Sequence, residues 1–162
     1  MAKESTFDIV SEVDTQEVAN AVNQASKEIQ QRYDFKDTGA AVEYSENTIT
    51  LTANAEERVN AALDVLQSKL IRRGISLKAL DAGEPVASGK HHRIVATIKE
   101  GIDQPTAKKI SKVIRDDGPK SVKASIQGDQ LRVSSKSRDD LQAVIGLLRD
   151  FEDAPLQFIN FK

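Results

Sequence analysis

Apolar and polar residues follow the same pattern in two stretches of the chain, Thr48 to Leu66 and Gly128 to Arg149. Each stretch begins with alternating apolar and polar residues, which is typical of a strand with one buried face. Each continues with apolar residues at every third or fourth position, which is typical of an amphipathic helix. A shift of 82 residues, from 49 to 131, places Ile49 on Leu131 and also aligns the helical apolar positions. We therefore predict that the chain is a duplication.

The first half of the chain supplies the other elements of one repeat. Asp14, a favoured N-cap residue with Glu17 three positions later, predicts the start of a helix whose apolar stripe extends to Tyr33. Asn54 is the predicted cap of the next helix, which ends at Gly74. Strands are predicted at residues 7–13, 42–45, 49–53 and 77–80, and residues 83–90, which contain two glycines and a proline, are a predicted linker.

The second half repeats this order. A strand is predicted over residues 93–99, and Pro105 suits the first turn of a helix that ends at Asp117-Gly118-Pro119. Strands at 122–126 and 131–133 follow, then a helix that Ser137 caps together with Asp140, and a final strand at 156–161. The same order of elements therefore occurs twice: strand, helix, strand, strand, helix, strand. This order predicts an α+β chain that is a tandem duplication of a ferredoxin-like βαββαβ sandwich.

The amino-acid composition excludes several kinds of functional site and of protein. The 162 residues include no cysteine, which excludes disulfides, a thiol nucleophile and a Cys-ligated metal site. No apolar run reaches the roughly 18 residues that a membrane span requires. The first residues lack the apolar core of a signal peptide. These features predict a cytoplasmic protein with no membrane partner.

Charge is distributed unevenly within a net charge of −2. Residues 1–60 carry five Lys or Arg against twelve Asp or Glu, whereas residues 99–139 carry ten against six. A basic patch in the second half is one interpretation, and a solvated surface of mixed sign is the other.

A catalytic centre is hard to assemble from these residues. The only histidines, His91 and His92, are adjacent, and adjacent strand residues point to opposite faces. The stretch from Gly83 to His91 resembles a phosphate-binding loop, but five residues rather than four separate its glycines, and a histidine follows the lysine. No serine lies in a nucleophile-elbow motif. We therefore predict no metal, no cofactor and no enzymatic activity.

Cations recur at helical spacing in the second half, at Lys108, Lys112 and Arg115, opposite an apolar stripe. These three side chains are candidate contacts for phosphates or RNA. The alternative is the ordinary solvated face of an amphipathic helix.

A second candidate surface is the polar side of the predicted strands that follow. If the apolar residues of these strands face the helices, the outward residues include Lys123, Gln127, Arg132 and Ser134. Lys136 and Arg138 come next, at a helix N-terminus, where free N–H groups favour anions. These six residues form our candidate nucleotide site. Asp139 and Asp140 in the same turn make a purely capping role the alternative at that end.

Four stretches resemble the YajQ family of small bacterial proteins: FDIVSEVD from Phe7, KLIRRGI around Arg73-Gly74, GIDQPTAKKI from Gly101, and IQGDQLRVSSKSRDDLQAV from Ile126; the ending QFINFK also fits. The resemblance implies two ferredoxin-like domains whose N-terminal strands are exchanged. The first domain would comprise residues 14–99, including strand 93–99, and the second residues 1–13 with 100–162. Family members often have glycine where this chain has Ser135, which puts the turn before the helix in doubt.

The family resemblance also implies nucleotide binding without catalysis, with purine nucleotides such as GTP and ATP, cyclic di-GMP or RNA as ligands. Our leading hypothesis is a nucleotide-binding protein that uses the six residues above. The alternatives are a protein that binds the RNA backbone and an adaptor that docks a transcription regulator. The repeat places Thr50 opposite Arg132 and Glu56 opposite Arg138, so only the second half carries these cations.

Overall fold

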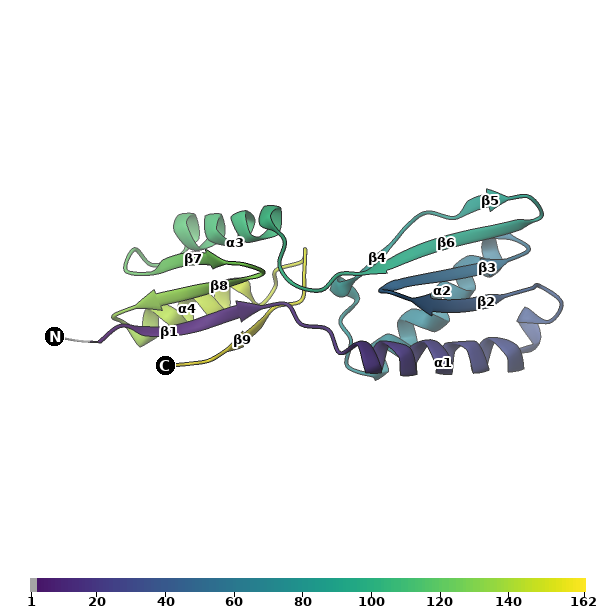
Figure 1. Ribbon diagram of the computed structural model, residues 1–162, viewed down its shortest axis with the longest axis horizontal. Coiled ribbons are helices and arrows are strands. Elements are labelled where there is room, and N and C mark those ends of the chain that lie inside the picture. Colours follow the sequence, from purple (N-terminus) through teal and green to yellow (C-terminus); the bar gives the residue numbers. More distant parts are fainter. Residues whose placement is uncertain (1–2) are drawn as a thin grey trace. The chain divides into compact units, whose positions relative to one another are not determined.

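The computed structural model describes residues 3–162, and the chain folds into two compact units (Figure 1). One unit is a continuous piece of chain, residues 13–99, and is called the contiguous unit below. The other combines the residues up to 12 with residues 100–162 and is called the split unit. Each unit has its own buried core.

The contiguous unit contains two helices and an antiparallel sheet. The helices are α1 (Thr15–Gln31) and α2 (Glu56–Arg72). The sheet has the strand order β2 (Ala41–Ser45), β3 (Thr48–Ala53), β6 (His91–Ile98) and β4 (Leu80–Ala82), and β5 (Val86–Ser88) pairs with the first part of β6. Single 3-10 turns, η1 (Tyr33–Phe35) and η2 (Leu77–Ala79), follow the two helices.

The split unit repeats this plan. Its helices are α3 (Gln104–Asp117) and α4 (Arg138–Leu148). Its antiparallel sheet has the order β7 (Lys123–Gln127), β8 (Gln130–Ser135), β1 (Ser5–Val10) and β9 (Gln157–Ile159). Strand β1 therefore holds the place in this sheet that β6 holds in the other. The prediction of an α+β chain with two ferredoxin-like units is confirmed.

The repeated apolar positions form the two cores. Ile49 and Leu51 of β3 are fully buried, as are Leu131 and Val133 of β8. The helix positions aligned with them, such as Val59 and Leu141, are buried in the respective clusters. Burial of these side chains drives each sheet against its own helices, because each removes apolar surface from water.

Side-chain caps fix where most helices begin. The Asp14 carboxylate accepts hydrogen bonds from the backbone N–H groups of Gln16 and Glu17, and the Ser137 hydroxyl accepts one from Asp140. Both predicted caps are thus confirmed. Glu17, expected to bond back to its cap, instead contacts Asn20 and Arg73.

Two predictions at helix ends are wrong. Asn54 is not the cap of α2, because Ala55 occupies that position without a side-chain bond. The backbone N–H of Asn54 donates instead to Thr38, and its side-chain amide donates to the carbonyl of Asp37. Tyr33 is not part of the buried stripe of α1, because it lies in η1 and is 86% exposed.

The predicted linker and the short strand before it are also wrong. Residues 77–79 form a 3-10 turn that Ser76 caps, and the strand begins at Leu80. The stretch 83–90 contains strand β5 and turns back onto β6, with Val86 opposite Arg93 and Ser88 opposite His91. Glycine and proline mark a hairpin here rather than a linker.

Candidate functional site

The open face of the split unit's sheet brings four predicted site residues onto one surface. The register pairs Lys123 with Ser134, Ser125 with Arg132, and Gln127 with Gln130. Directly opposed residues in a sheet share a face. Because Leu131 and Val133 are buried on the other side, Lys123, Gln127, Arg132 and Ser134 all lie on the face away from the core.

Arg132 is hydrogen-bonded to a buried carboxylate on this face. Its Nε donates to Asp8 Oδ1 over 3.0 Å, and the side-chain amide of Asn160 donates to Asp8 Oδ2 over 2.9 Å. Asp8 is only 2% exposed. The two donors, Arg132 first and Asn160 second, hold the pKa of the Asp8 carboxyl below its usual value, and Asp8 in turn raises the pKa of Arg132. Arg132 is thereby held in place with its side chain 47% exposed.

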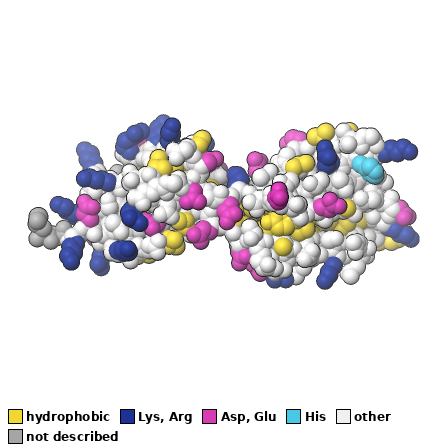
Figure 2. Space-filling model, viewed as in Figure 1, with side chains coloured by type: hydrophobic (Ala, Val, Ile, Leu, Met, Phe, Trp, Pro, Cys, Tyr) yellow, Lys and Arg dark blue, Asp and Glu magenta, His cyan; other side chains and the backbone are white. Residues whose placement is uncertain are grey.

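A hollow of about 610 Å³ lies between α3 and the edge strand β7, and we call it the cationic hollow. Arg115, Lys120 and Lys123 line it, together with Ser111 and small apolar residues. Arg115 contacts its neighbour Asp116, whereas Lys120 and Lys123 form no ion pair with any residue in the described range 3–162. Figure 2 shows Lys and Arg side chains gathered over the α3 side of this unit. The hollow therefore favours an anion.

The three cations predicted on α3 divide between two surroundings. Arg115 lines the cationic hollow. Lys108 and Lys112 are exposed on the helix and do not line it. Their neighbour Lys109 pairs with Asp153, 2.7 Å away. The helical stripe alone therefore does not define a site.

Arg138 lies on the other side of the sheet from Arg132. Arg138 Nε donates to the hydroxyl of Ser5 over 3.3 Å, and Ser5 is opposite Ser135 on the helix side of the sheet. Lys136 is exposed in the turn between β8 and α4. The six predicted nucleotide-site residues thus do not form one cluster.

Ser135, where the family resemblance led us to expect glycine, forms part of that turn. Its hydroxyl accepts a hydrogen bond from the backbone N–H of Ser137 and lies 2.7 Å from the hydroxyl of Ser121. Ser121 also contacts the Asp140 carboxylate. The turn is therefore compatible with a side chain at this position.

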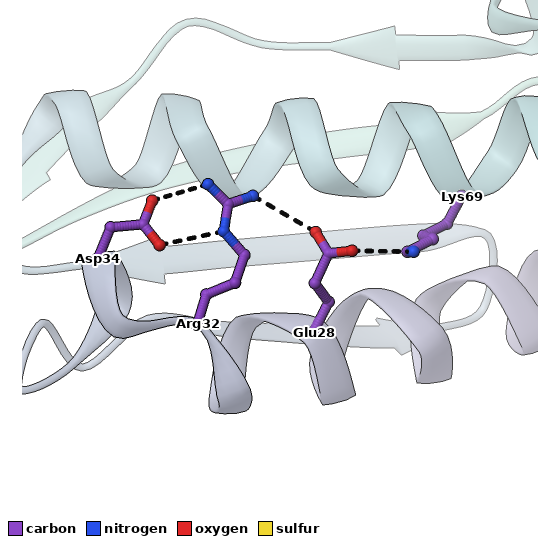
Figure 3. A network of polar contacts seen from close by, with 4 residues as sticks. All are labelled: Glu28, Arg32, Asp34 and Lys69. Carbon is purple, nitrogen blue, oxygen red and sulfur yellow. Dashed lines mark hydrogen bonds and ion pairs between the residues drawn. The ribbon is translucent and has the colours of Figure 1, made fainter.

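A network of four charged side chains lies elsewhere, in the contiguous unit (Figure 3). Glu28 of α1 joins Lys69 of α2 at 3.0 Å and Arg32 at 3.3 Å, and Arg32 also joins Asp34 at 2.7 Å. The pKa of the Glu28 carboxyl is lowered, chiefly by Lys69. Because each cation here faces a carboxylate, the network links helices and leaves little free charge for an anionic ligand.

Within residues 3–162, no group of three or more His, Cys, Asp or Glu side chains is arranged to hold a metal ion. In the same range, no helix combines the length and the apolar character needed to cross a membrane. Lys120 and Ser111 belong to the cationic hollow but were not among the predicted site residues. Only the packing of α3 on β7 brings them to it.

Two split βαβ units in one chain, with one open sheet face carrying cations, define a tandem ferredoxin-like protein with a candidate anion site. The profile of the family described as "Nucleotide-binding protein YajQ-like" matches residues 5–162, and the chain belongs to this family. It is 65% identical over 161 residues to a protein of Streptomyces griseus named "Nucleotide-binding protein", covering 98% of this chain and 99% of that one. Relatives of the same name in Nocardia farcinica and Thermobifida fusca are 65% identical (98% and 99% covered) and 58% identical (both fully covered).

Proposed function

We propose that this chain is a non-catalytic, cytoplasmic nucleotide-binding protein whose phosphate subsite is the cationic hollow. The observation that carries the proposal is the convergence of Arg115, Lys120 and Lys123 on one hollow beside the open sheet face. Charge-assisted hydrogen bonds from Lys and Arg to phosphate are among the stronger polar contacts in proteins. The names of the relatives point to the same class of ligand.

The open face adds groups suited to the rest of a nucleotide. Ser134 of β8 lies opposite Lys123 of β7, and Gln127 is the last residue of β7. A hydroxyl and an amide both donate and accept hydrogen bonds, as the polar edge of a base requires. The hollow volume of about 610 Å³ falls within the roughly 300–1,000 Å³ typical of ligand pockets.

We infer a purine nucleotide, GTP, ATP or cyclic di-GMP, as the ligand. Arg132 is a further cation on the face that Lys123 shares, and its terminal nitrogens form no bond with any residue between 3 and 162. A ligand with more than one phosphate meets both the hollow and Arg132. Asp8, the carboxylate on this face, is buried and already accepts from two side chains. It is therefore poorly placed to act as a general base, which favours binding without catalysis.

Calorimetric titration of the full chain with GTP, ATP and cyclic di-GMP tests the proposal. Lys120→Gln and Lys123→Gln each remove one cation from the hollow and are expected to weaken binding about 10-fold or more, as for a lost charged hydrogen bond. Lys27→Gln, an exposed lysine of α1, is the matched control and is expected to bind like wild type. Absence of binding to all three nucleotides contradicts the function. Binding that ignores both variants contradicts the placement.

A second candidate is binding of an RNA backbone, favoured by the exposed Lys108 and Lys112 beside the hollow-lining Arg115. A row of cations along one helix matches successive phosphates rather than a single nucleotide. Such binding depends strongly on salt, because it releases condensed counterions. Affinity for a structured RNA should then fall steeply with added salt, and more so in wild type than in a Lys108→Gln/Lys112→Gln double variant. A salt-independent affinity argues against it.

A further inference from the structure

A second cavity, of about 420 Å³, lies beside strand β1 and helix α4 of the split unit. In the sheet, β1 is separated from the edge strand β7 by β8. The cavity is lined by Ser5 and Thr6 of β1, by Arg138, Leu141 and Gln142 of α4, and by Phe161 and Lys162 beyond β9. We call it the Phe161 cavity. It shares no lining residue with the cationic hollow.

Phe161 is an exposed aromatic side chain that the structure holds in place. It is 58% exposed, yet its ring stacks on the buried Phe7 with centroids 5.7 Å apart and planes inclined by 29°. On one side of it, Asn160 donates to Asp8 over 2.9 Å. On the other side, Lys162 and Thr6 exchange two backbone hydrogen bonds of 3.0 Å. The ring is thus fixed before any ligand arrives, which lowers the entropic cost of stacking against it.

The remaining walls supply one apolar side chain and several polar ones, among them Arg138, Gln142 and Lys162. Leu141 is a buried side chain of α4 and continues the apolar surface of Phe161. Arg138 is positioned by its Nε bond to Ser5, and its terminal nitrogens form no hydrogen bond to any residue from 3 to 162. Gln142 presents an exposed amide one helical turn from Arg138. Ring, cation and amide therefore meet around one cavity.

We propose that the Phe161 cavity is a second binding site, for a nucleoside monophosphate. The base stacks on Phe161 against Leu141, its polar edge is read by Gln142, and its single phosphate accepts from the Arg138 guanidinium. The volume is near the lower end of the roughly 300–1,000 Å³ range of ligand pockets, which suits one base with one phosphate better than a dinucleotide. The site stands on its own geometry and does not depend on the cationic hollow.

The test is titration of the full, isotopically labelled chain with AMP and GMP, followed by NMR and calorimetry. Backbone amide signals of Arg138, Gln142 and Phe161 should shift with either ligand. Adenosine, which lacks the anion, and inorganic phosphate, which lacks the ring, should each bind more weakly. Phe161→Ala should weaken AMP binding roughly 5- to 150-fold, the range reported for losing a base–aromatic stack.

Phe161 also packs on Phe7, so a variant at an exposed cation keeps the test independent of folding. Arg138→Gln should weaken AMP binding about 10-fold or more, as expected for a lost hydrogen bond to a charged group. Arg149→Gln, an exposed arginine beyond the other end of α4, should leave it unchanged. In Lys120→Gln and Lys123→Gln, the AMP-induced shifts of Arg138, Gln142 and Phe161 should persist at the same AMP concentration, which separates this site from the one proposed above. Inorganic phosphate binding as tightly as AMP, or AMP binding unaffected by Arg138→Gln, overturns the proposal.

Discussion

The two units share a strand order but carry different charges on their open sheet faces. In the contiguous unit, the open face carries Glu43 opposite Thr50, Asp81 opposite Thr97 and Arg93 opposite Thr52. In the split unit, the open face carries Lys123 and the Asp8–Arg132 pair. At these positions the first face thus has two exposed carboxylates and one cation, whereas the second has two cations and one buried carboxylate.

This difference shows which positions the fold constrains. The aligned core residues Ile49 and Leu131 are both fully buried, so both repeats keep an apolar side chain there. The open face carries no such constraint, because its side chains meet solvent rather than helices. Thr50 in one repeat accordingly corresponds to Arg132 in the other, and we expect ligand binding where the cations are.

The largest effect is expected from truncating a core isoleucine in either central strand. Ile9 of β1 and Ile94 of β6 are both fully buried, but in different cores. Each change to Ala should cost about 2–5 kcal/mol of unfolding free energy. Ile9→Ala should speed amide hydrogen exchange in residues 100–162, and Ile94→Ala in residues 13–99. Faster exchange in the opposite unit would show that β1 and β6 belong to the other sheets.

A smaller loss is expected from Asp8→Asn, which weakens the charge pair on the split unit's sheet. Leaving Arg132 and Asn160 without a charged acceptor should cost roughly 1–3 kcal/mol near neutral pH. Because the pKa of Asp8 is lowered in the folded state, its contribution is present above the unfolded value of about 3.9 and disappears as pH falls through the lower folded value. Urea unfolding at neutral and acidic pH measures this difference. Asp64→Asn, at an exposed position of α2, is the control and should leave the free energy of unfolding at neutral pH unchanged.

The next largest loss of stability is expected from removing the side-chain caps of helices. Asp14→Ala removes the acceptor for two backbone N–H groups and should cost about 1 kcal/mol of unfolding free energy. Ser137→Ala, at the equivalent place before α4, should cost a similar amount. Asn54→Ala should change stability by less than about 0.5 kcal/mol, since Asn54 caps no helix. A loss at Asn54 equal to that at Asp14 would restore Asn54 as a cap.

The smallest effect is expected from a change in the network of Glu28, Arg32, Asp34 and Lys69 (Figure 3). Glu28 is 36% exposed, so solvent screens its pairs with Lys69 and Arg32. Glu28→Gln should therefore cost at most about 1 kcal/mol, and less as salt is added. Unfolding at low and high ionic strength measures this, with the exposed Glu84→Gln as the control. A loss that salt does not change would show that packing, rather than charge, accounts for the role of Glu28.

Local pattern was sufficient for most of the fold. The alternation around Leu131 and Val133 predicted a half-buried strand, and Ser137 predicted the helix that follows. The errors lie where distant contacts compete with local preference. Asn54 bonds to residues 37 and 38 rather than to its own helix, and the stretch 83–90 becomes a hairpin because β6 offers it a partner.

Some residues of the candidate sites could likewise be placed from local pattern, whereas others are brought there only by distant contacts. Strand alternation was sufficient to place Lys123, Arg132 and Ser134 on one face, and their role in binding stays a prediction. Lys120 joins the cationic hollow only through the packing of α3 on β7. Phe161 lines a cavity only because the last residues of the chain pair with the first strand. No window of local sequence contains that information.

The place of β1 in its sheet has a consequence for synthesis on the ribosome. Asp8 and Arg132, which meet across β1 and β8, are 124 residues apart in the chain. At roughly 5–20 residues per second, translation separates their emergence by about 6–25 s. The contiguous unit, residues 13–99, can fold during that interval, whereas β1 leaves the ribosome first and must wait without its partners. We therefore expect nascent chains to pass through a stage with one finished unit and a solvent-exposed N-terminal strand, which a chaperone would recognise by the apolar side chains of Phe7 and Ile9.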